Sequence, residues 1–427
     1  MGAAHKHNSE IYYVRVDETR CNGCVLCTKA CPTKAIRVRR GTARIEGVCI
    51  SCGECTRVCP LSAINAVTPQ RDLDVSRHYS VVSASTVIYS QFGEGVMPND
   101  ILLALRHMRL GTVHDQSYTS EMFSLALQFH IKEKRREPDA TFPMISPVCP
   151  VVVRLILHRF PSLLKHIPPL ITPREIVARE AKERLSAKRG LLPEDIRVLH
   201  ITSCPAKMLC IREPVIQSHS YLDSAMGIPA IYDELRRHIQ EQDEDVVLHH
   251  SGGAGLAWGM SGGEIAGIEG NCLAISGIQE TIQYLYKIEM GLMSHIDYIE
   301  FRTCPEGCLG GPFTVADKYL AKHHLGKLVR MFGMERRVKY SYVQKLYEQG
   351  WFFSDTSEEP LIGPSLHLSS TDIAKRIERQ NQVEEVLNVL PRKECGICGA
   401  PDCRTLAEDV VDGKARMEAC VLLERGQ

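Results

Sequence analysis

The stretch DYIEFRTCPEGCLGGP, residues 297–312, joins a short apolar run to a loop that carries two cysteines. Its first part, with Tyr298 and Phe301, is rich in β-branched and aromatic residues and therefore predicts a strand. The second part contains Cys304 and Cys308 among proline and glycine, which are turn-forming residues. The stretch thus predicts a strand whose carboxyl end presents two thiol groups.

Two other segments of the chain repeat this plan. FPMISPVC ends at Cys149 and IRVLHITSC ends at Cys204, and a proline follows each cysteine. In open α/β sheets ligands gather beyond the carboxyl ends of the strands. We therefore expect Cys149, Cys204, Cys304 and Cys308 to meet at one point, although they lie far apart in the sequence. Four thiolates without a nearby histidine suit an iron–sulfur cluster, or less often a structural zinc ion.

The composition limits the classes of partner. The chain has 427 residues, for which two to four domains are expected. Its 51 basic and 51 acidic residues cancel, so charge gives no reason to expect nucleic acid or an anionic membrane as a partner. The first ten residues, MGAAHKHNSE, lack the apolar core of a signal peptide, and no apolar run reaches membrane-spanning length. We expect a cytoplasmic protein, and its 18 cysteines are more consistent with metal binding than with disulfides.

Eight cysteines near the N-terminus form two copies of one motif, C-x2-C-x2-C-x3-C-P. This is the spacing of bacterial two-cluster ferredoxins, in which the fourth cysteine of each run binds the other cluster. One [4Fe–4S] cluster is therefore assigned to Cys21, Cys24, Cys27 and Cys59, and the second to Cys31, Cys49, Cys52 and Cys55. A pair of zinc sites is the alternative, which two complete copies ending in Cys-Pro disfavour.

The middle of the chain alternates between predicted strands and helices. A polar segment, residues 67–77, is expected to be a linker. Helices are predicted at residues 99–109 (with Asn99 or Asp100 as the N-cap), 118–133, 150–160, 173–187 and 279–290. Strands are predicted at residues 81–89, 142–146, 196–202, 245–249 and 298–301. This alternation favours a mostly parallel sheet covered by helices. A further helix, residues 370–390, is expected to lead into the C-terminal tail.

The tail carries a third cysteine motif, Cys395-x2-Cys398-x4-Cys403-x16-Cys420. A glycine directly follows each of the first two cysteines, and glycine lets backbone N–H groups approach sulfur atoms. A zinc knuckle is the alternative reading of such a motif. We prefer a [4Fe–4S] cluster, because the spacing resembles small cluster domains of corrinoid iron–sulfur and electron-transport proteins.

The three strand-and-loop segments also carry a family resemblance. SPVCP, TSCPAK and TCPEGCLGGP, in this order behind a two-cluster ferredoxin, resemble the three signature loops of [FeFe] hydrogenases. The resemblance spans about residues 1–365. It implies that Cys149, Cys204, Cys304 and Cys308 hold a [4Fe–4S] cluster, and that Cys308 also bridges to a diiron subsite with CO, CN⁻ and azadithiolate ligands. It further implies that Lys207 donates to a cyanide ligand; a solvated lysine in the first turn of a helix is the alternative.

Several positions depart from the pattern of fast hydrogenases. Val148 stands where those enzymes have a cysteine that relays protons, and losing a positioned acid or base typically costs about 10²–10⁴ in rate. Thr202 and Arg302 stand at methionine positions, Cys210 at a glutamate position and Pro312 at a glycine position. These departures resemble the sensory branch of the family, in which slow reaction with H₂ reports its presence. They are also compatible with loss of the diiron site.

These observations combine into one expected architecture and two leading hypotheses. We predict an α/β protein with a 2[4Fe–4S] ferredoxin domain (residues 1–70), an H-cluster domain with mostly parallel sheets (78–365) and a C-terminal helix with a [4Fe–4S] domain (366–427). The first hypothesis is a slow, sensory hydrogenase that exchanges H₂ and protons, with Cys308 and Lys207 at its catalytic site.

In this hypothesis electrons leave through the ferredoxin domain and, separately, through the C-terminal cluster. The recipient would be a ferredoxin or a signalling kinase or phosphatase. The second hypothesis is an electron-transfer or scaffold protein with four cubanes and no diiron subsite. Reduction of another small molecule at the altered site is a third, weaker alternative. The oligomeric state stays open, with a homodimer among the alternatives.

Overall fold

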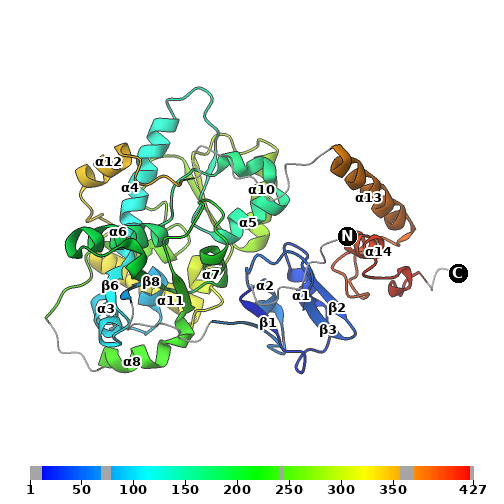
Figure 1. Cartoon of the computed structure of the whole chain (residues 1–427), viewed down its shortest axis with the longest axis horizontal. Coiled ribbons are helices and arrows are strands. Elements are labelled where there is room, and N and C mark those ends of the chain that lie inside the picture. The colour runs from blue at the N-terminus through cyan, green and yellow to red at the C-terminus, as the bar shows by residue number, and fades with distance from the viewer. Residues whose placement is uncertain (1–11, 69–77, 241–244, 356–369, 424–427) are drawn as a thin grey trace. The chain divides into compact units, whose positions relative to one another are not determined.

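The computed structural model describes residues 12–68, 78–240, 245–355 and 370–423 (Figure 1). The chain divides into two compact units. The first unit combines Met1–Val67 with Ile362–Gln427, and the second contains Thr68–Leu361. The N-terminal and C-terminal cysteine motifs therefore lie in the same unit, although the whole second unit separates them in the sequence. Within the described ranges, none of the helices has the length and apolar character needed to cross a membrane.

The N-terminal part of the first unit consists of two short β-α-β halves. Its elements are β1 (Val14–Val16), α1 (Leu26–Ala30), β2 (Ile36–Arg39), β3 (Thr42–Ile45), α2 (Glu54–Val58) and β4 (Ile64–Ala66). Strands β1 and β4 pair antiparallel, and β2 and β3 form an antiparallel hairpin. Arg40 and Gly41 both have positive φ angles at the hairpin turn, as a tight two-residue turn requires. The small core includes Val14, Ile36 and Ile64 together with cysteine side chains.

The C-terminal part of the first unit consists of α13 (Ser370–Val389) and α14 (Cys403–Val411). The Asp402 side chain caps α14 by accepting a hydrogen bond from the Thr405 backbone N–H at 2.7 Å. Helix α13 ends one residue earlier than the predicted range of 370–390. Val383 and Leu406 belong to the cluster of buried residues that joins the two helices.

The second unit contains two parallel sheets covered by helices. The strand order in the larger sheet is β6-β5-β8-β9, and in the smaller sheet it is β10-β11-β7; every pairing is parallel. The strands are β5 (Tyr79–Ala84), β6 (Thr112–Asp115), β7 (Met144–Ile145), β8 (Ile196–Thr202), β9 (Ser224–Gly227), β10 (Cys272–Ser276) and β11 (Tyr298–Arg302). The helices are α3 (Pro98–His107), α4 (Gln116–Lys134), α5 (Pro150–Arg159), α6 (Pro173–Arg189), α7 (Pro205–Arg212), α8 (Tyr232–Gln240), α9 (Gly253–Leu256), α10 (Ile278–Glu289), α11 (Lys318–Phe332) and α12 (Tyr340–Glu348).

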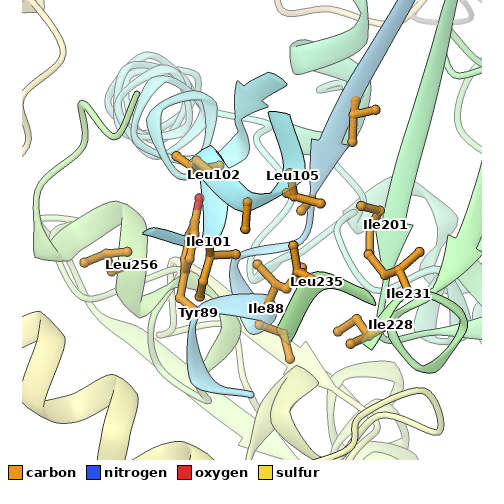
Figure 2. Close-up of a cluster of buried hydrophobic side chains, with 14 of the residues drawn as sticks. Ile88, Tyr89, Ile101, Leu102, Leu105, Ile201, Ile228, Ile231, Leu235 and Leu256 are labelled. Carbon is orange, nitrogen blue, oxygen red and sulfur yellow. The ribbon is translucent and has the colours of Figure 1, made fainter. Parts of the chain in front are cut away.

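A large apolar core fixes the sheet of β5 and β8 in place. Ile101, Leu102 and Leu105 of α3 belong to one cluster of buried side chains with Ile201 of β8 and Leu235 of α8, and Figure 2 shows this cluster. These side chains are almost completely buried. Fully burying an aliphatic side chain of this size stabilises a fold by about 1.5–3 kcal/mol. The core therefore holds rigid the carboxyl end of β8, from which the loop with Cys204 leaves.

Most of the predicted elements are present within one to three residues of their expected bounds. β8 matches its predicted range, and α4, α5, α6 and α10 lie close to theirs. The N-cap of α3 is Met97, so the prediction of Asn99 or Asp100 is wrong. The Asp100 carboxylate instead accepts a hydrogen bond from the Met97 backbone N–H at 2.8 Å. The predicted strand 81–89 is too long, because Thr86–Ser90 turns into a 3₁₀ helix after β5.

The strand predicted at residues 245–249 is absent: this segment has no regular secondary structure. The physical reason is a side chain. The Leu248 and His249 backbone N–H groups both donate to the side-chain carbonyl oxygen of Asn99, at 2.7 and 3.2 Å. The Asn99 amide also donates to the Val246 carbonyl oxygen at 2.9 Å. Asn99 thus takes the place of a neighbouring strand. The predicted linker at residues 67–77 lies mostly outside the described residues.

Candidate metal centre

The three predicted loops converge, and they come from two different sheets. Cys149 caps α5 after β7, Cys204 caps α7 after β8, and Cys304 and Cys308 follow β11. Strands β7 and β11 are neighbours in the smaller sheet, whereas β8 belongs to the larger one. All four cysteines line one cavity with an empty volume of about 330 Å³, including the part open to solvent. The structure therefore brings together the four thiols that the sequence separates.

Glycines allow the third loop to approach its neighbours. Gly307 has a φ of +77°, and a Cβ atom there would lie 2.5 Å from the Ser261 backbone nitrogen. A Cβ atom on Gly311 would lie 2.4 Å from the Ser203 carbonyl oxygen. That same carbonyl accepts a hydrogen bond from the Phe313 backbone N–H at 3.1 Å. The loop that carries Cys304 and Cys308 therefore packs directly on the loop that carries Cys204.

Lys207 lies inside the site and not in solvent. Its side chain projects from the first turn of α7, is 7% exposed and lines the cavity of the four cysteines. The distance from Lys207 Nζ to Cys308 Sγ is 4.0 Å. Burial raises the pKa of Cys204 to about 11, with Lys207 opposing that shift and the neighbouring cysteines adding to it. Burial, together with the charges of Lys207 and Arg174, holds the pKa of His200 well below its ordinary value, so His200 is neutral.

A buried charged network stands beside the cysteines. The Arg302 guanidinium lines the same cavity, although its side chain is only 1% exposed. Arg302 Nη2 lies 2.6 Å from a Glu264 carboxylate oxygen, and Arg302 Nε lies 3.7 Å from Glu300. Glu264 also accepts hydrogen bonds from the Tyr298 hydroxyl and, at 2.8 Å, from the Ser146 hydroxyl. We define Arg302, Glu264 and Glu300 as the arginine–carboxylate cluster.

The titration of this cluster follows from its burial. Burial raises the pKa of Glu300 to about 7, with Arg302 opposing the shift and Glu264 adding to it. Burial would lower the pKa of Arg302, but Glu264, Glu300 and the sulfurs of Cys308 and Cys149 together raise it. Arg302 is therefore a permanent cation near the cysteines. Glu264 and Glu300 were not predicted from the sequence as residues of the site. Glu300 could have been noticed, because a glutamate between Ile299 and Phe301 interrupts an apolar strand and indicates a buried partner.

Two other positions near the site are buried. Val148 lies in an apolar cluster that includes Met122 and Trp258, and its own side chain has no group that could carry a proton. Its backbone N–H donates to the Ser146 hydroxyl at 3.2 Å. Cys210 is also buried, and it lines a different cavity together with Arg174. Burial raises the pKa of Cys210, which opposes its use as a substitute acid or base.

The ferredoxin-like cysteines gather in the two groups that the swapped pattern predicts. Cys21, Cys24, Cys27 and Cys59 line one cavity with an empty volume of about 310 Å³. The other group is recognised by its electrostatics: burial raises the pKa of Cys52 well above its ordinary value, and the sulfurs of Cys31, Cys55 and Cys49 raise it further. The fourth cysteine of each run therefore lies with the first three of the other.

The tail cysteines form a group of the same size. Cys395, Cys398, Cys403 and Cys420 line a cavity with an empty volume of about 320 Å³. Gly396 and Gly399, which follow the first two of these cysteines, have φ angles of +77° and +83°. These left-handed conformations wrap the chain tightly around the cavity and favour glycine.

Comparisons with known proteins agree with this geometry. Residues 78–269 match the family model of the iron only hydrogenase large subunit, C-terminal domain. Residues 20–64 match a 4Fe-4S dicluster domain, and residues 390–422 match a putative Fe-S cluster domain. Iron hydrogenase 1 of Clostridium pasteurianum is 23% identical over 208 residues, a match that covers 46% of this chain and 35% of that protein. One component of an ion-translocating oxidoreductase complex of Rhodobacter capsulatus is 43% identical over 44 residues, 10% of this chain and 24% of that protein.

The matches to these curated relatives therefore span about a third or less of the relatives' own length. Among solved structures, a variant of [FeFe]-hydrogenase HydA1 from Chlamydomonas reinhardtii aligns with a TM-score of 0.52 at 16% identity. The alignment covers 66% of this chain and 91% of that one. A structure on H-cluster assembly in HydA(deltaEFG) gives the same values, and this likeness establishes the fold. The chain therefore contains a hydrogenase-like α/β domain with mostly parallel sheets, a 4Fe-4S dicluster ferredoxin domain and a C-terminal iron–sulfur domain.

Proposed function

We propose that this protein is a slow, sensory hydrogenase-like oxidoreductase, which reacts with H₂ and protons and passes electrons through four [4Fe–4S] clusters. The observation that supports it most is the central cavity, where four cysteines from three separate loops of the hydrogenase-like fold meet beside Lys207. Four thiolates without a histidine in this lining suit an iron–sulfur cluster, and less often a structural zinc ion.

The residues present fit four cubanes. Three cavities are each lined by four cysteines. The fourth group, around Cys52, has the same number of mutually close sulfurs. Thiolates are the ligands that iron–sulfur clusters require. We assign one [4Fe–4S] cluster to each group.

The residues around Cys308 also fit a negatively charged diiron subsite. When bound, that subsite would supply the open coordination position at which H₂ is split heterolytically. The chain contributes two buried cations on the wall of the cavity, Lys207 and Arg302. Lys207 can donate a charge-assisted hydrogen bond to an anionic diatomic ligand. Lys207 Nζ lies 4.0 Å from Cys308 Sγ, and Cys308 is therefore the thiolate that we assign to hold the subsite.

The slow rate follows from the surroundings of Val148. A fast enzyme needs an acid or base that moves protons between the site and solvent, and this position offers only an apolar side chain in an apolar cluster. Slow turnover with intact H₂ binding suits a protein that reports H₂ instead of consuming it. The partner would then be a ferredoxin or a signalling kinase or phosphatase that receives the electrons.

One observation keeps an electron-transfer protein without the diiron subsite as the second candidate. Arg302 stands where the family pattern has a methionine, and its buried guanidinium lines the cavity beside the cysteines; this departure is compatible with loss of the diiron site. The two candidates differ in iron content: four cubanes contain about 16 irons, and the diiron subsite adds about two.

Infrared spectroscopy on protein produced with the hydrogenase maturation enzymes separates these candidates. We expect bands from metal-bound CO and CN⁻, which Cys308→Ala should abolish, whereas Cys272→Ala, which changes a cysteine outside all four groups, should keep them. Absence of the bands in a sample with about 16 irons would favour the second candidate. Bands accompanied by H₂ turnover as fast as that of standard hydrogenases would refute the slow, sensory assignment.

A further inference from the structure

The C-terminal cluster domain packs directly on the ferredoxin domain through β2. The Val38 backbone N–H donates to the Gly399 carbonyl oxygen at 2.8 Å. Val38 lines the cavity of Cys21, Cys24, Cys27 and Cys59, and Gly399 directly follows Cys398, which lines the tail cavity. A single hydrogen bond therefore connects the walls of two cluster cavities that lie at opposite ends of the sequence.

A buried ion pair fixes this contact. Arg37 Nε lies 2.6 Å from Asp409, Arg37 Nη2 lies 3.2 Å from its other carboxylate oxygen, and the two residues are 7% and 4% exposed. Arg39 Nη2 reaches the same carboxylate at 2.5 Å. Residues two apart on a strand share a face, so Arg37 and Arg39 point together toward Asp409. A bidentate, buried arginine–carboxylate pair is specific in geometry as well as in charge.

Further contacts surround the cluster motifs themselves. Lys29, between Cys27 and Cys31, donates to the Pro401 carbonyl oxygen at 2.6 Å and also to the Glu394 carbonyl oxygen. A Cβ atom on Gly399 would lie 2.0 Å from the Val38 carbonyl oxygen, so the observed approach requires glycine at this position. The glycine of the cysteine motif therefore serves the contact between the domains in addition to the tail cavity.

We propose that the C-terminal cluster exchanges electrons directly with the cluster held by Cys21, Cys24, Cys27 and Cys59, across the contact between Val38 and Gly399. In each step one cluster loses one electron and the other gains it; no bond forms and no proton moves. The C-terminal cluster is then the last member of the ferredoxin branch and not a second, separate exit. This inference rests on the cluster assignments of the proposed function, but not on reaction with H₂.

Magnetic coupling in the full chain tests this route. Two reduced clusters at such a contact broaden or split each other's electron paramagnetic resonance signals. We would reduce the anaerobic protein with dithionite and compare it with Cys403→Ala, which lacks one ligand of the C-terminal cluster. The difference spectrum should be broadened or split, and the remaining ferredoxin signals should sharpen in the variant. A difference spectrum equal to that of an isolated, uncoupled cluster would overturn the proposal.

A charge reversal at the contact provides the second test. Asp409→Arg places a third cation against Arg37 and Arg39 and should separate the domains. Asp412→Arg, one turn away at the end of α14 and paired with the exposed Arg379, is the matched control. In freeze-quench experiments with dithionite, we expect electrons to reach the C-terminal cluster at least ten times more slowly in Asp409→Arg, and within a factor of two in the control.

Iron content must equal that of the unaltered chain in both variants before their rates are compared. An Asp409→Arg protein with full iron, unchanged coupling and an unchanged rate would overturn the proposal. The outcomes also separate the two levels of inference. Magnetic coupling in a protein without CO and CN⁻ bands would support the electron route and argue against the diiron subsite. CO and CN⁻ bands in a protein without coupling would support the diiron subsite and argue against the electron route.

Discussion

Arg302 is the residue that most distinguishes the central site. It is a buried cation on the wall of the cysteine cavity, held by Glu264 at 2.6 Å. Removing one partner of a buried pair leaves an uncompensated charge, which costs about 3–5 kcal/mol. Breaking the pair of Arg302 and Glu264 would therefore destabilise the fold. Because the pair lies beside the cysteine cavity, we expect its charge to act on the cluster. A fixed positive charge favours the reduced, more negative state of a nearby cluster.

Arg302→Met in a Glu264→Gln background should lower the reduction potential of the central cubane. An interaction of about 1–2 kcal/mol at an effective dielectric constant of about 20 corresponds to about 40–90 mV for a one-electron couple. Redox titration followed by electron paramagnetic resonance would measure the shift. Glu264→Gln alone, which retains the cation, is the control and should not lower the potential. A double variant with the same potential as Glu264→Gln would show that Arg302 has no electrostatic effect on the cluster.

Glu300 should make stability depend on pH. Burial raises its pKa from 4.5 in the unfolded chain to about 7 in the fold. The folded protein therefore holds a proton that the unfolded chain releases, so this contribution to stability is complete below about pH 4.5 and is lost as pH rises through about 7. The linkage amounts to about 3 kcal/mol over that window.

Glu300→Gln removes this titration while keeping a side chain of the same shape. The urea midpoint of the unaltered protein should therefore fall relative to that of Glu300→Gln between pH 5 and pH 7.5, under anaerobic conditions. Parallel pH profiles for the two proteins would mean that Glu300 does not change its protonation state over this range.

Val148→Cys tests the missing relay. The substitution places a thiol where the apolar side chain blocks proton movement, and H₂ evolution should rise. Because Val148 lies in an apolar cluster, we expect an increase of about tenfold, below the range of about 10²–10⁴ that a complete acid–base path gives. Val148→Ala, which adds space but no acid, is the control. Equal rates for the two variants would place the limiting step elsewhere.

At the scale of elements, the repeated unit is a strand, a loop with cysteine and proline, and a helix that begins at the cysteine. This unit was predictable, because the apolar runs, the prolines and the cysteines are contiguous in the sequence. β8 and α7 show it most clearly. What the pattern could not reveal was the division of the strands between two sheets. Strand pairing depends on contacts far apart in the sequence, and the pairing of β7 with β11 has no local signal.

The strand wrongly predicted at residues 245–249 shows a second limit of prediction from sequence. Its apolar residues, Val246, Val247 and Leu248, have strand character, but its hydrogen bonds go to the Asn99 side chain. A side chain that imitates a neighbouring strand cannot be recognised from the segment alone. The arginine–carboxylate cluster was missed for a related reason, because Glu264 and Arg302 are 38 residues apart and meet only in the fold.

The next prediction concerns Gly399→Ala, in the loop that precedes α14. Gly399 has a φ of +83°, and a Cβ atom would lie 2.0 Å from the Val38 carbonyl oxygen. The left-handed conformation costs a non-glycine residue about 1 kcal/mol, and the collision adds to it. We expect the variant to lose its C-terminal cluster, measured as about four fewer irons per chain. Gly413→Ala, with a φ of +70° and no atom within 4 Å of the added Cβ, bears the conformational cost alone and should keep its iron.

At the scale of the whole molecule, local cysteine spacing predicted three of the four groups of thiols, and the ends of the predicted strands predicted the fourth. Spacing could not show that the two terminal iron–sulfur segments share one compact unit. That arrangement depends on Arg37 and Asp409, two charged residues to which the cysteine motifs assign no role. Charged residues are usually solvated, so neither would be selected from the sequence as an interface residue.

The central claim is that three loops from two sheets bring Cys149, Cys204, Cys304 and Cys308 to one inorganic core. Iron-edge anomalous X-ray diffraction from anaerobically purified crystals tests it most directly. We predict anomalous density for a four-iron core bonded to all four sulfur atoms. A single metal ion between these cysteines, or four cysteines without a shared iron core, would contradict the account.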